Sequence, residues 1–162
     1  MSYTLSMMRR LLLSMFLIFG GSFASADTLP GPIPADVVRV IDGDTVRVRA
    51  HIWVNQSVEV SVRLAGVDTP EIYRPACREE RVYADAAKTT VESLVGEELF
   101  LTNVAHGKYA GRVVAGILTS DGVDLGEYLL NNGHAVEDGT PDPWCDATPT
   151  PSAEIAASAP AP

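Results

Sequence analysis

Residues 37–64 read VVRVIDGDTVRVRAHIWVNQSVEVSVRL, and this stretch decides the fold. A short apolar run leads to Asp42-Gly43, a dipeptide typical of tight turns between strands. Over residues 46–54 and 58–64, apolar side chains alternate with polar or aromatic ones. A period of two is the pattern of a strand with one buried face. We therefore predict a meander of three strands, with its second turn at residues 55–57 and the alternating apolar side chains in the core.

Two helices and two further strands are predicted downstream. Apolar residues on one side and charged residues on the other indicate an amphipathic helix over residues 79–95. Residues 99–104 and 112–118 read as strands, and Asp124 with Glu127 forms a capping box that opens a second helix. The order therefore predicts an α+β protein, mainly β with helices. The expected architecture is a five-stranded OB-fold-type barrel, with one helix between the third and fourth strands and another after the fifth.

The two ends of the chain differ in composition from the predicted barrel. A pair of arginines, an apolar run and the small residues Ala24-Ser25-Ala26 have the layout of a signal peptide, so residues 1–26 are expected to be cleaved off. The alternative is an uncleaved N-terminal anchor. Residues 27–35 are predicted to be a linker and residues 36–145 the folded domain. The Ala, Pro, Ser and Thr of residues 146–162 predict a disordered tail.

Charge, export and cysteine content limit the possible functions. The chain carries −9 at pH 7, and losing residues 1–26 would leave −11, from 10 basic and 21 acidic residues. Such a charge argues against a tight, non-specific coat on nucleic acid, but not against an enzyme that uses a metal and a few arginines. A signal peptide predicts a periplasmic or secreted protein, which we expect to be monomeric and without stable membrane association. Outside the cytoplasm, Cys77 and Cys145 can pair or remain free thiols.

Three motifs carry candidate chemistry: IDGDT at residues 41–45, RLAGVDTPE at residues 63–71 and KYAGR at residues 108–112. They place Asp44, Asp68 and Glu71 just after predicted turns or strands, where neighbouring strands can bring the acids to one barrel edge. Clustered carboxylates repel one another unless a cation neutralises them, and Ca²⁺ takes such oxygen ligands. Arg63 and Arg112 can grip a phosphodiester with paired hydrogen bonds. Each motif alone is more often structural, so the interpretation depends on their combination.

The three motifs, in this order, resemble the thermonuclease (staphylococcal nuclease-like) family over about residues 36–136. The resemblance implies an OB-type barrel and an enzyme, a calcium-dependent endonuclease and exonuclease that hydrolyses DNA and RNA to 3′-phosphate products. It implies Ca²⁺ as the cofactor and nucleic acid as the substrate. By position, Asp44 and Asp68 match the calcium-binding carboxylates, Thr69 matches a ligand that uses its backbone carbonyl, and Asp42 matches a nearby acid.

The same resemblance assigns the catalytic side chains. Glu71 matches the carboxylate taken as the general base, and Arg63 and Arg112 match the arginines that hold the phosphate and stabilise its charge. Lys108 and Tyr109 match residues of a substrate-binding segment. All the residue types of the family's active set are therefore present in this chain.

Two departures from the family pattern bear on function. Ala110 lengthens the KYGR-type segment by one residue, which changes the expected aim of Lys108 and Tyr109. The family's last helix has no counterpart in the sequence. We hypothesise that a bridge between Cys77 and Cys145 holds the C-terminal end of the domain instead.

Two other functions compete with the nuclease. A non-catalytic OB-fold module that binds nucleic acid or protein predicts the loss of some active residues, yet none is lost. Such a module also needs a basic or aromatic face to hold single strands, which a charge of −11 does not favour. A calcium-binding envelope protein without hydrolytic activity leaves the two arginines without a role.

Overall fold

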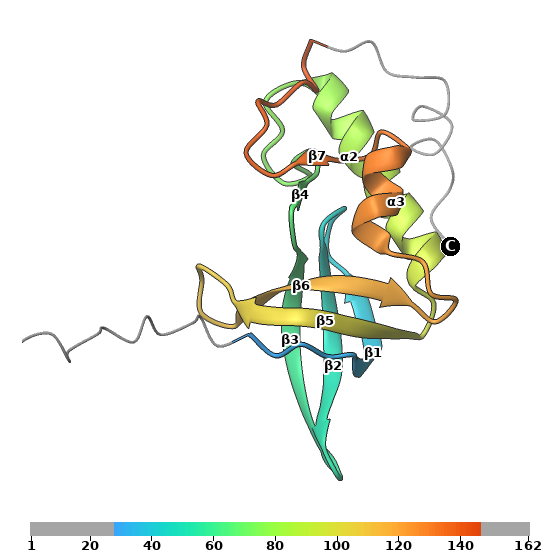
Figure 1. Cartoon of the computed structure of the whole chain (residues 1–162). Helices are drawn as coiled ribbons and strands as arrows, with labels where there is room; N and C mark the ends of the chain where they lie inside the picture. The colour runs from blue at the N-terminus through green and yellow to red at the C-terminus, as the bar shows by residue number, and fades with distance from the viewer. Residues whose placement is uncertain (1–27, 147–162) are drawn as a thin grey trace, which may run out of the picture.

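Five strands close into a barrel in the part of the chain described by the computed structural model, residues 28–146 (Figure 1). The predicted signal peptide lies outside the described residues, and so does the predicted tail apart from Asp146. Two helices lie together at one end of the barrel, and the β2–β3 hairpin projects from the other end.

The alternating stretch forms the first three strands of the barrel. These are β1 (Ile33–Val40), β2 (Thr45–Trp53) and β3 (Gln56–Leu64), and each pairs antiparallel with the next. Val46 lies opposite Val62 in the β2–β3 pair, and both side chains are fully buried. The predicted meander is confirmed because the period of two matches the pleat of these strands.

Two later strands close the barrel. β5 (Glu98–His106) pairs antiparallel with β1 and with β6 (Arg112–Thr119), and β6 runs parallel to β3. The closed order β1-β2-β3-β6-β5 confirms the predicted five-stranded OB-fold-type barrel of the α+β class.

The helices cover one end of the barrel core. α2 (Arg78–Val95) directs Val91 and Val95 into it, and α3 (Leu125–Asn131) packs beside β6. Asp124 caps α3 by accepting a hydrogen bond from the Glu127 N–H at 3.0 Å, as the capping-box motif predicts. The largest fully buried side chains of strands and helices include Val46, Val48, Val62, Leu99, Leu101, Ile117, Leu125 and Leu129. No helix within residues 28–146 has the length and apolar character that crossing a membrane requires.

The segment predicted as a linker contributes to the barrel. β1 begins at Ile33, which pairs with Leu101 of β5. Leu29 and Val104 also exchange two backbone hydrogen bonds, of 2.9 and 2.8 Å. The Pro/Gly-rich composition masked the start of this strand, because proline weakens strand propensity without preventing pairing at a strand's first residues.

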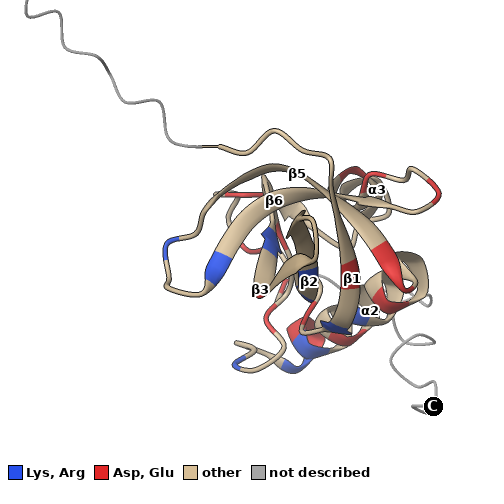
Figure 2. Cartoon of the chain, turned by 90° about the horizontal axis from the view of Figure 1, so that it is seen from below, with Lys and Arg blue, Asp and Glu red and all other residues tan. Residues whose placement is uncertain are grey.

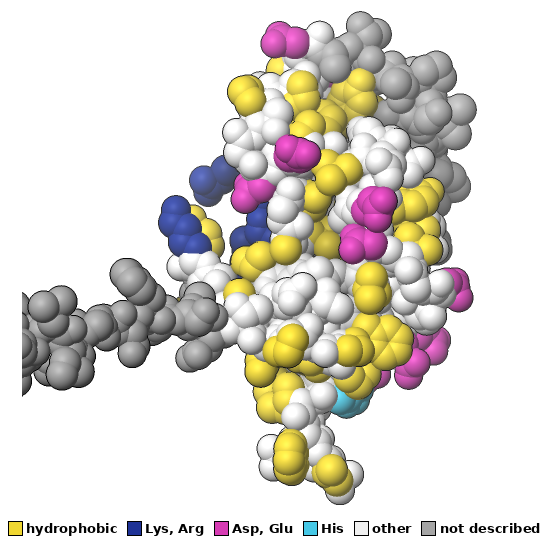
Figure 3. All heavy atoms as spheres, in the orientation of Figure 1, with side chains coloured by type: hydrophobic (Ala, Val, Ile, Leu, Met, Phe, Trp, Pro, Cys, Tyr) yellow, Lys and Arg dark blue, Asp and Glu magenta, His cyan; other side chains and the backbone are white. Residues whose placement is uncertain are grey.

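The tip of the β2–β3 hairpin differs from the prediction. The turn comprises Val54 and Asn55 rather than residues 55–57, and Asn55 adopts a positive φ of 58°. Ile52, Val54 and Val58 were predicted to face the core, but they are exposed. These side chains are exposed because the hairpin extends beyond the part of the molecule that the helices and the other strands cover. Figure 3 shows the apolar tip.

The C-terminal segment folds back over α2. A two-residue strand, β7 (Val136–Glu137), pairs with the two-residue strand β4 (Val67–Asp68). Both strands are too short for a periodic pattern to predict them. Further on, the Trp144 ring packs against Tyr83 of α2, with ring centroids 5.5 Å apart. Cys145 forms a disulfide with Cys77, and the Cα atoms of the two residues lie 5.7 Å apart. These contacts hold the segment without another helix.

Candidate active site

The β1–β2 turn presents the first acid of the site. The N–H groups of Ile41 and Asp42 both donate to the Thr45 carbonyl, which closes the turn and directs Asp44 toward β3. The Asp44 residue is only 3% exposed. At Gly43, a Cβ atom would lie 2.9 Å from Thr69 Oγ1. A glycine is therefore needed where this turn touches the segment that follows β3.

Arg63 joins two of the predicted acids. From β3 its Nη1 donates to Asp44 Oδ2 and its Nη2 to Asp68 Oδ1, each at 2.6 Å. Asp68 lies in β4, which β7 holds in place, and Thr45 Oγ1 donates to the other Asp44 oxygen at 2.7 Å. Charge-assisted bonds of this length are strong, so the three side chains form one preorganised unit.

The charge of Asp44 is disfavoured where it lies. Burial, and after it the nearby Asp42 carboxylate, raise the pKa of Asp44 from 3.8 to about 6, although Arg63 and the Thr45 hydroxyl act in the opposite direction. Burial lowers the pKa of Arg63, but Asp44 and Asp68 outweigh that and raise it above its ordinary value. The negative charge of Asp44 is therefore only partly compensated by its neighbours, whereas Arg63 stays protonated.

Glu71 lies at the rim of the same pocket with an exposed carboxylate. Its Oε1 accepts a hydrogen bond from the Tyr73 N–H at 2.9 Å. Among residues 28–146, no lysine, arginine or histidine forms an ion pair with Glu71. The carboxylate therefore remains available for a water molecule or a metal.

These side chains surround one polar pocket of about 60 Å³, room for a cation and a few waters. Its lining residues are Asp42, Asp44, Arg63, Asp68, Thr69, Pro70, Glu71 and Ile72. Four carboxylates and one guanidinium give the lining a formal charge of −3. Oxygen donors with this charge fit a hard divalent cation such as Ca²⁺.

The carboxylates of the pocket do not lie close enough together to form a preformed set of metal ligands. Within residues 28–146, only Cys77, Glu80 and Cys145 have potential ligand atoms that all lie within 4.8 Å of one another. In the pocket, Arg63 lies between Asp44 and Asp68 and supplies the positive charge. A bound cation would share that role with Arg63.

Arg112, Lys108 and Tyr109 form a second cluster outside the pocket lining. The Arg112 guanidinium and the Lys108 ammonium lie 5.9 and 5.8 Å from the centroid of the exposed Tyr109 ring. Figure 2 shows basic residues at the start of β6 and in the loop before it. Arg63 lies opposite Val114, two residues after Arg112, so strand alternation puts both arginines on the outer face of adjacent strands.

One residue of the site was not singled out from the sequence. Glu80 is 3% exposed, and its carboxylate accepts the Glu71 N–H at 3.0 Å. The available signal was its helical spacing, which puts this charged residue on the same face as the buried Ala84, Ala87 and Val91. An acid on the apolar face of a helix requires a partner.

Fold and site together define a class: an OB-type barrel with an acid–arginine pocket at its rim, and a basic, aromatic cluster at the start of the neighbouring strand and in the loop before it. A family model for the staphylococcal nuclease homologue matches residues 61–149, more than half of the chain. The chain therefore belongs to the staphylococcal nuclease homologue family. No curated protein matches it. Asp44 precedes the matched residues, so its place in the site depends on the geometry around Arg63.

Proposed function

We propose that this protein is an exported, calcium-dependent nuclease that hydrolyses phosphodiester bonds of DNA or RNA and leaves 3′-phosphates. The observation that carries the proposal is the meeting of Asp44, Arg63, Asp68 and Glu71 around one pocket. Family membership supports nuclease chemistry in general. The metal is proposed on the residues of the pocket, the export on the signal-peptide layout and the disulfide, and the 3′-phosphate products on the resemblance to thermonucleases.

The acids would hold the metal. Asp44 and Asp68 offer carboxylates, and Thr69, which also lines the pocket, offers its backbone carbonyl. A bound Ca²⁺ supplies Lewis-acid polarisation of a phosphate oxygen. The raised pKa of Asp44 supports this assignment, since burial without a cation leaves its charge poorly compensated.

Arg63 keeps donors for the substrate. A guanidinium has five N–H groups, and the bonds to Asp44 and Asp68 use one on each terminal nitrogen. The remaining donors can hold the phosphate and stabilise the charge that develops on it. Arg112, on the same outer face at the start of β6, and the Lys108–Tyr109 pair in the loop before it would bind the phosphate and nucleotide.

Glu71 would position or deprotonate the attacking water. Its carboxylate is exposed, lies at the pocket rim and forms no ion pair with the described residues, so it can accept a proton. Its loop is held from α2, which fixes where the carboxylate meets the substrate. The disulfide supports export, because such bonds persist in oxidising compartments.

Cleavage assays test the proposal. The purified protein is incubated with single-stranded DNA, duplex DNA and RNA, with added Ca²⁺ and then with chelator. Calcium-dependent cleavage of any of these substrates is expected, and its absence with well-folded protein over a range of pH and salt would favour the non-catalytic binding module. Cell fractionation of the natural host tests export, with enzyme in the periplasm or medium as the expected result.

A further inference from the structure

The first turn of α2 carries two acids in different surroundings. Glu79 is partly exposed and suits the positive end of the helix, as acids in first turns commonly do. Glu80 is buried, and a buried carboxylate is costly unless hydrogen bonds satisfy it. The hydrogen bonds that satisfy the buried Glu80 carboxylate therefore indicate the role of this residue.

The Glu80 carboxylate ties down both ends of the loop that carries Glu71. Its Oε1 accepts the N–H of Glu71 at 3.0 Å, and its Oε2 accepts the N–H of Ala76. The next residue, Arg81, donates from Nη1 to the Ile72 carbonyl at 2.9 Å. Two adjacent helix residues thus fix three backbone groups of residues 71–76.

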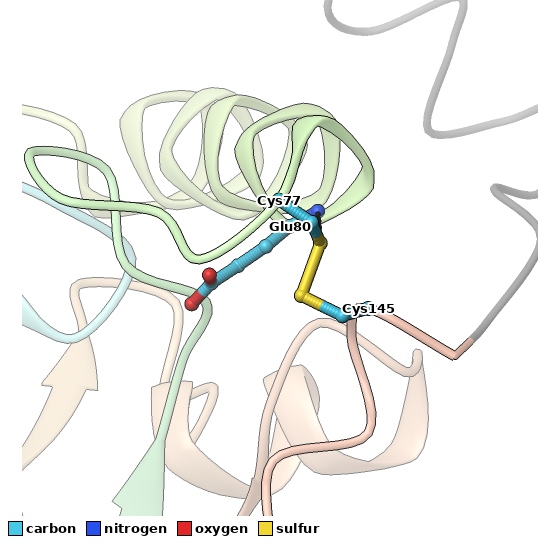
Figure 4. A group of neighbouring side chains, drawn as sticks. All are labelled: Cys77, Glu80 and Cys145. Carbon is cyan, nitrogen blue, oxygen red and sulfur yellow. Dashed lines mark hydrogen bonds between the residues drawn. A yellow bond between two sulfur atoms is a disulfide. The ribbon is translucent and has the colours of Figure 1, made fainter.

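A metal site at this position does not fit. Cys77 and Cys145 are joined in a disulfide, and thiolates, rather than disulfide sulfurs, are metal ligands. Figure 4 shows the Glu80 carboxylate extending from α2 away from the sulfur–sulfur bond. The bridge instead supports the same turn, because Cys77 Sγ accepts the Glu80 N–H at 3.3 Å.

We propose that Glu80 is a positioning residue for catalysis, which sets the location of the Glu71 carboxylate through the Glu71 and Ala76 amides. This inference rests on the proposed nuclease function for its effect on turnover. The proposed metal ligands Asp44, Asp68 and Thr69 lie outside residues 71–76, and Arg63 and the β4–β7 pair hold the two carboxylates. Loss of the Glu80 carboxylate therefore moves the base and leaves calcium binding in place.

The test compares Glu80→Gln with Glu79→Gln, which removes the same charge from the same helical turn. Hydrogen exchange measured by NMR reports directly on the two amides. In E80Q one amide faces an NH₂ group instead of an acceptor, so the exchange of the Glu71 or Ala76 N–H should accelerate by at least about tenfold. E79Q should exchange as the wild type does.

Kinetics provide the second readout. E80Q should lower kcat by about 10- to 100-fold, because misplacing a catalytic group costs that much, with the calcium Kd changed less than about twofold. Added to Glu71→Gln, the E80Q change should cause no further loss, since the base that Glu80 positions is already absent. A merely structural role predicts additive losses and weaker calcium binding. If E80Q lacks the wild-type circular dichroism spectrum, Glu80→Asp, which keeps the charge and loses the reach, replaces it.

The outcomes separate this inference from the proposed function. Unchanged exchange at both amides, or additive kinetic losses, would overturn the positioning role whatever the activity. Accelerated exchange in a protein whose wild type cleaves no nucleic acid would overturn the nuclease and retain the contact alone.

Discussion

Asp44→Asn should stabilise the metal-free protein and remove its response to calcium. The substitution keeps the shape of the side chain and removes the negative charge. In the metal-free fold that charge is only partly compensated, because burial and Asp42 outweigh Arg63 and the Thr45 hydroxyl.

The magnitude follows from the pKa of Asp44. Raising it from 3.8 to about 6 corresponds to about 3 kcal/mol of destabilisation when the group is ionised. The folded state binds the proton more tightly than the unfolded state does. Stability therefore falls as pH rises from about 4 to about 6, and the full cost is present above that window. At pH 7.5 with chelator, D44N should be more stable than the wild type by up to about 3 kcal/mol.

Urea denaturation with chelator, and then with Ca²⁺, measures both effects. Calcium should stabilise the wild type in proportion to RT ln(1 + [Ca²⁺]/Kd) and leave D44N nearly unchanged. Lower stability of metal-free D44N at pH 7.5, or equal stabilisation of both proteins by calcium, would refute this reasoning. The same proton competition should weaken calcium binding to the wild type as pH falls below about 6.

Three further predictions concern other contacts of the site. Gly43→Ala should lose about 1–3 kcal/mol in unfolding free energy and bind calcium more weakly, because the new Cβ pushes against Thr69; urea denaturation and calorimetry measure both. Arg112→Lys should lower kcat/KM by about tenfold or more while the calcium Kd stays constant, since an ammonium cannot grip phosphate with two bonds; a retained kcat/KM would remove Arg112 from the site. Reducing the Cys77–Cys145 bridge should cost about 4 kcal/mol by the loop-entropy relation, and thiol labelling of native, oxidised protein should find no reactive cysteine.

The barrel was predictable because its strands alternate along the sequence. The pleat of a strand appears in the sequence as apolar residues at every second position. Helix α3 was indicated by a capping box, which the structure forms. Single-sequence periodicity does not show how far a strand extends past the core. For this reason Ile52 and Val54 were assigned to a buried face that ends before the hairpin tip.

The acid–arginine pocket was predictable only through the motifs taken together. Asp44 and Asp68 are 24 positions apart in the sequence, and they meet because Arg63 reaches both from β3. The role of Glu80 could not be predicted from the sequence, because its partners are two backbone amides, and every residue type but proline carries such a group. Arg112 was grouped with Arg63 by motif, whereas the structure places its guanidinium beside Tyr109.

End-group analysis of a cleaved, labelled oligonucleotide tests the proposed chemistry most directly. Wild-type protein and Glu71→Gln are compared with Ca²⁺ and with chelator, and calcium binding by each is measured in parallel. We predict 3′-phosphate products from the wild type only with Ca²⁺, and at least about a 100-fold loss in E71Q, which still binds the ion. Cleavage that persists in chelator, or E71Q that cleaves as fast as the wild type, would contradict a calcium-dependent nuclease with Glu71 as its base.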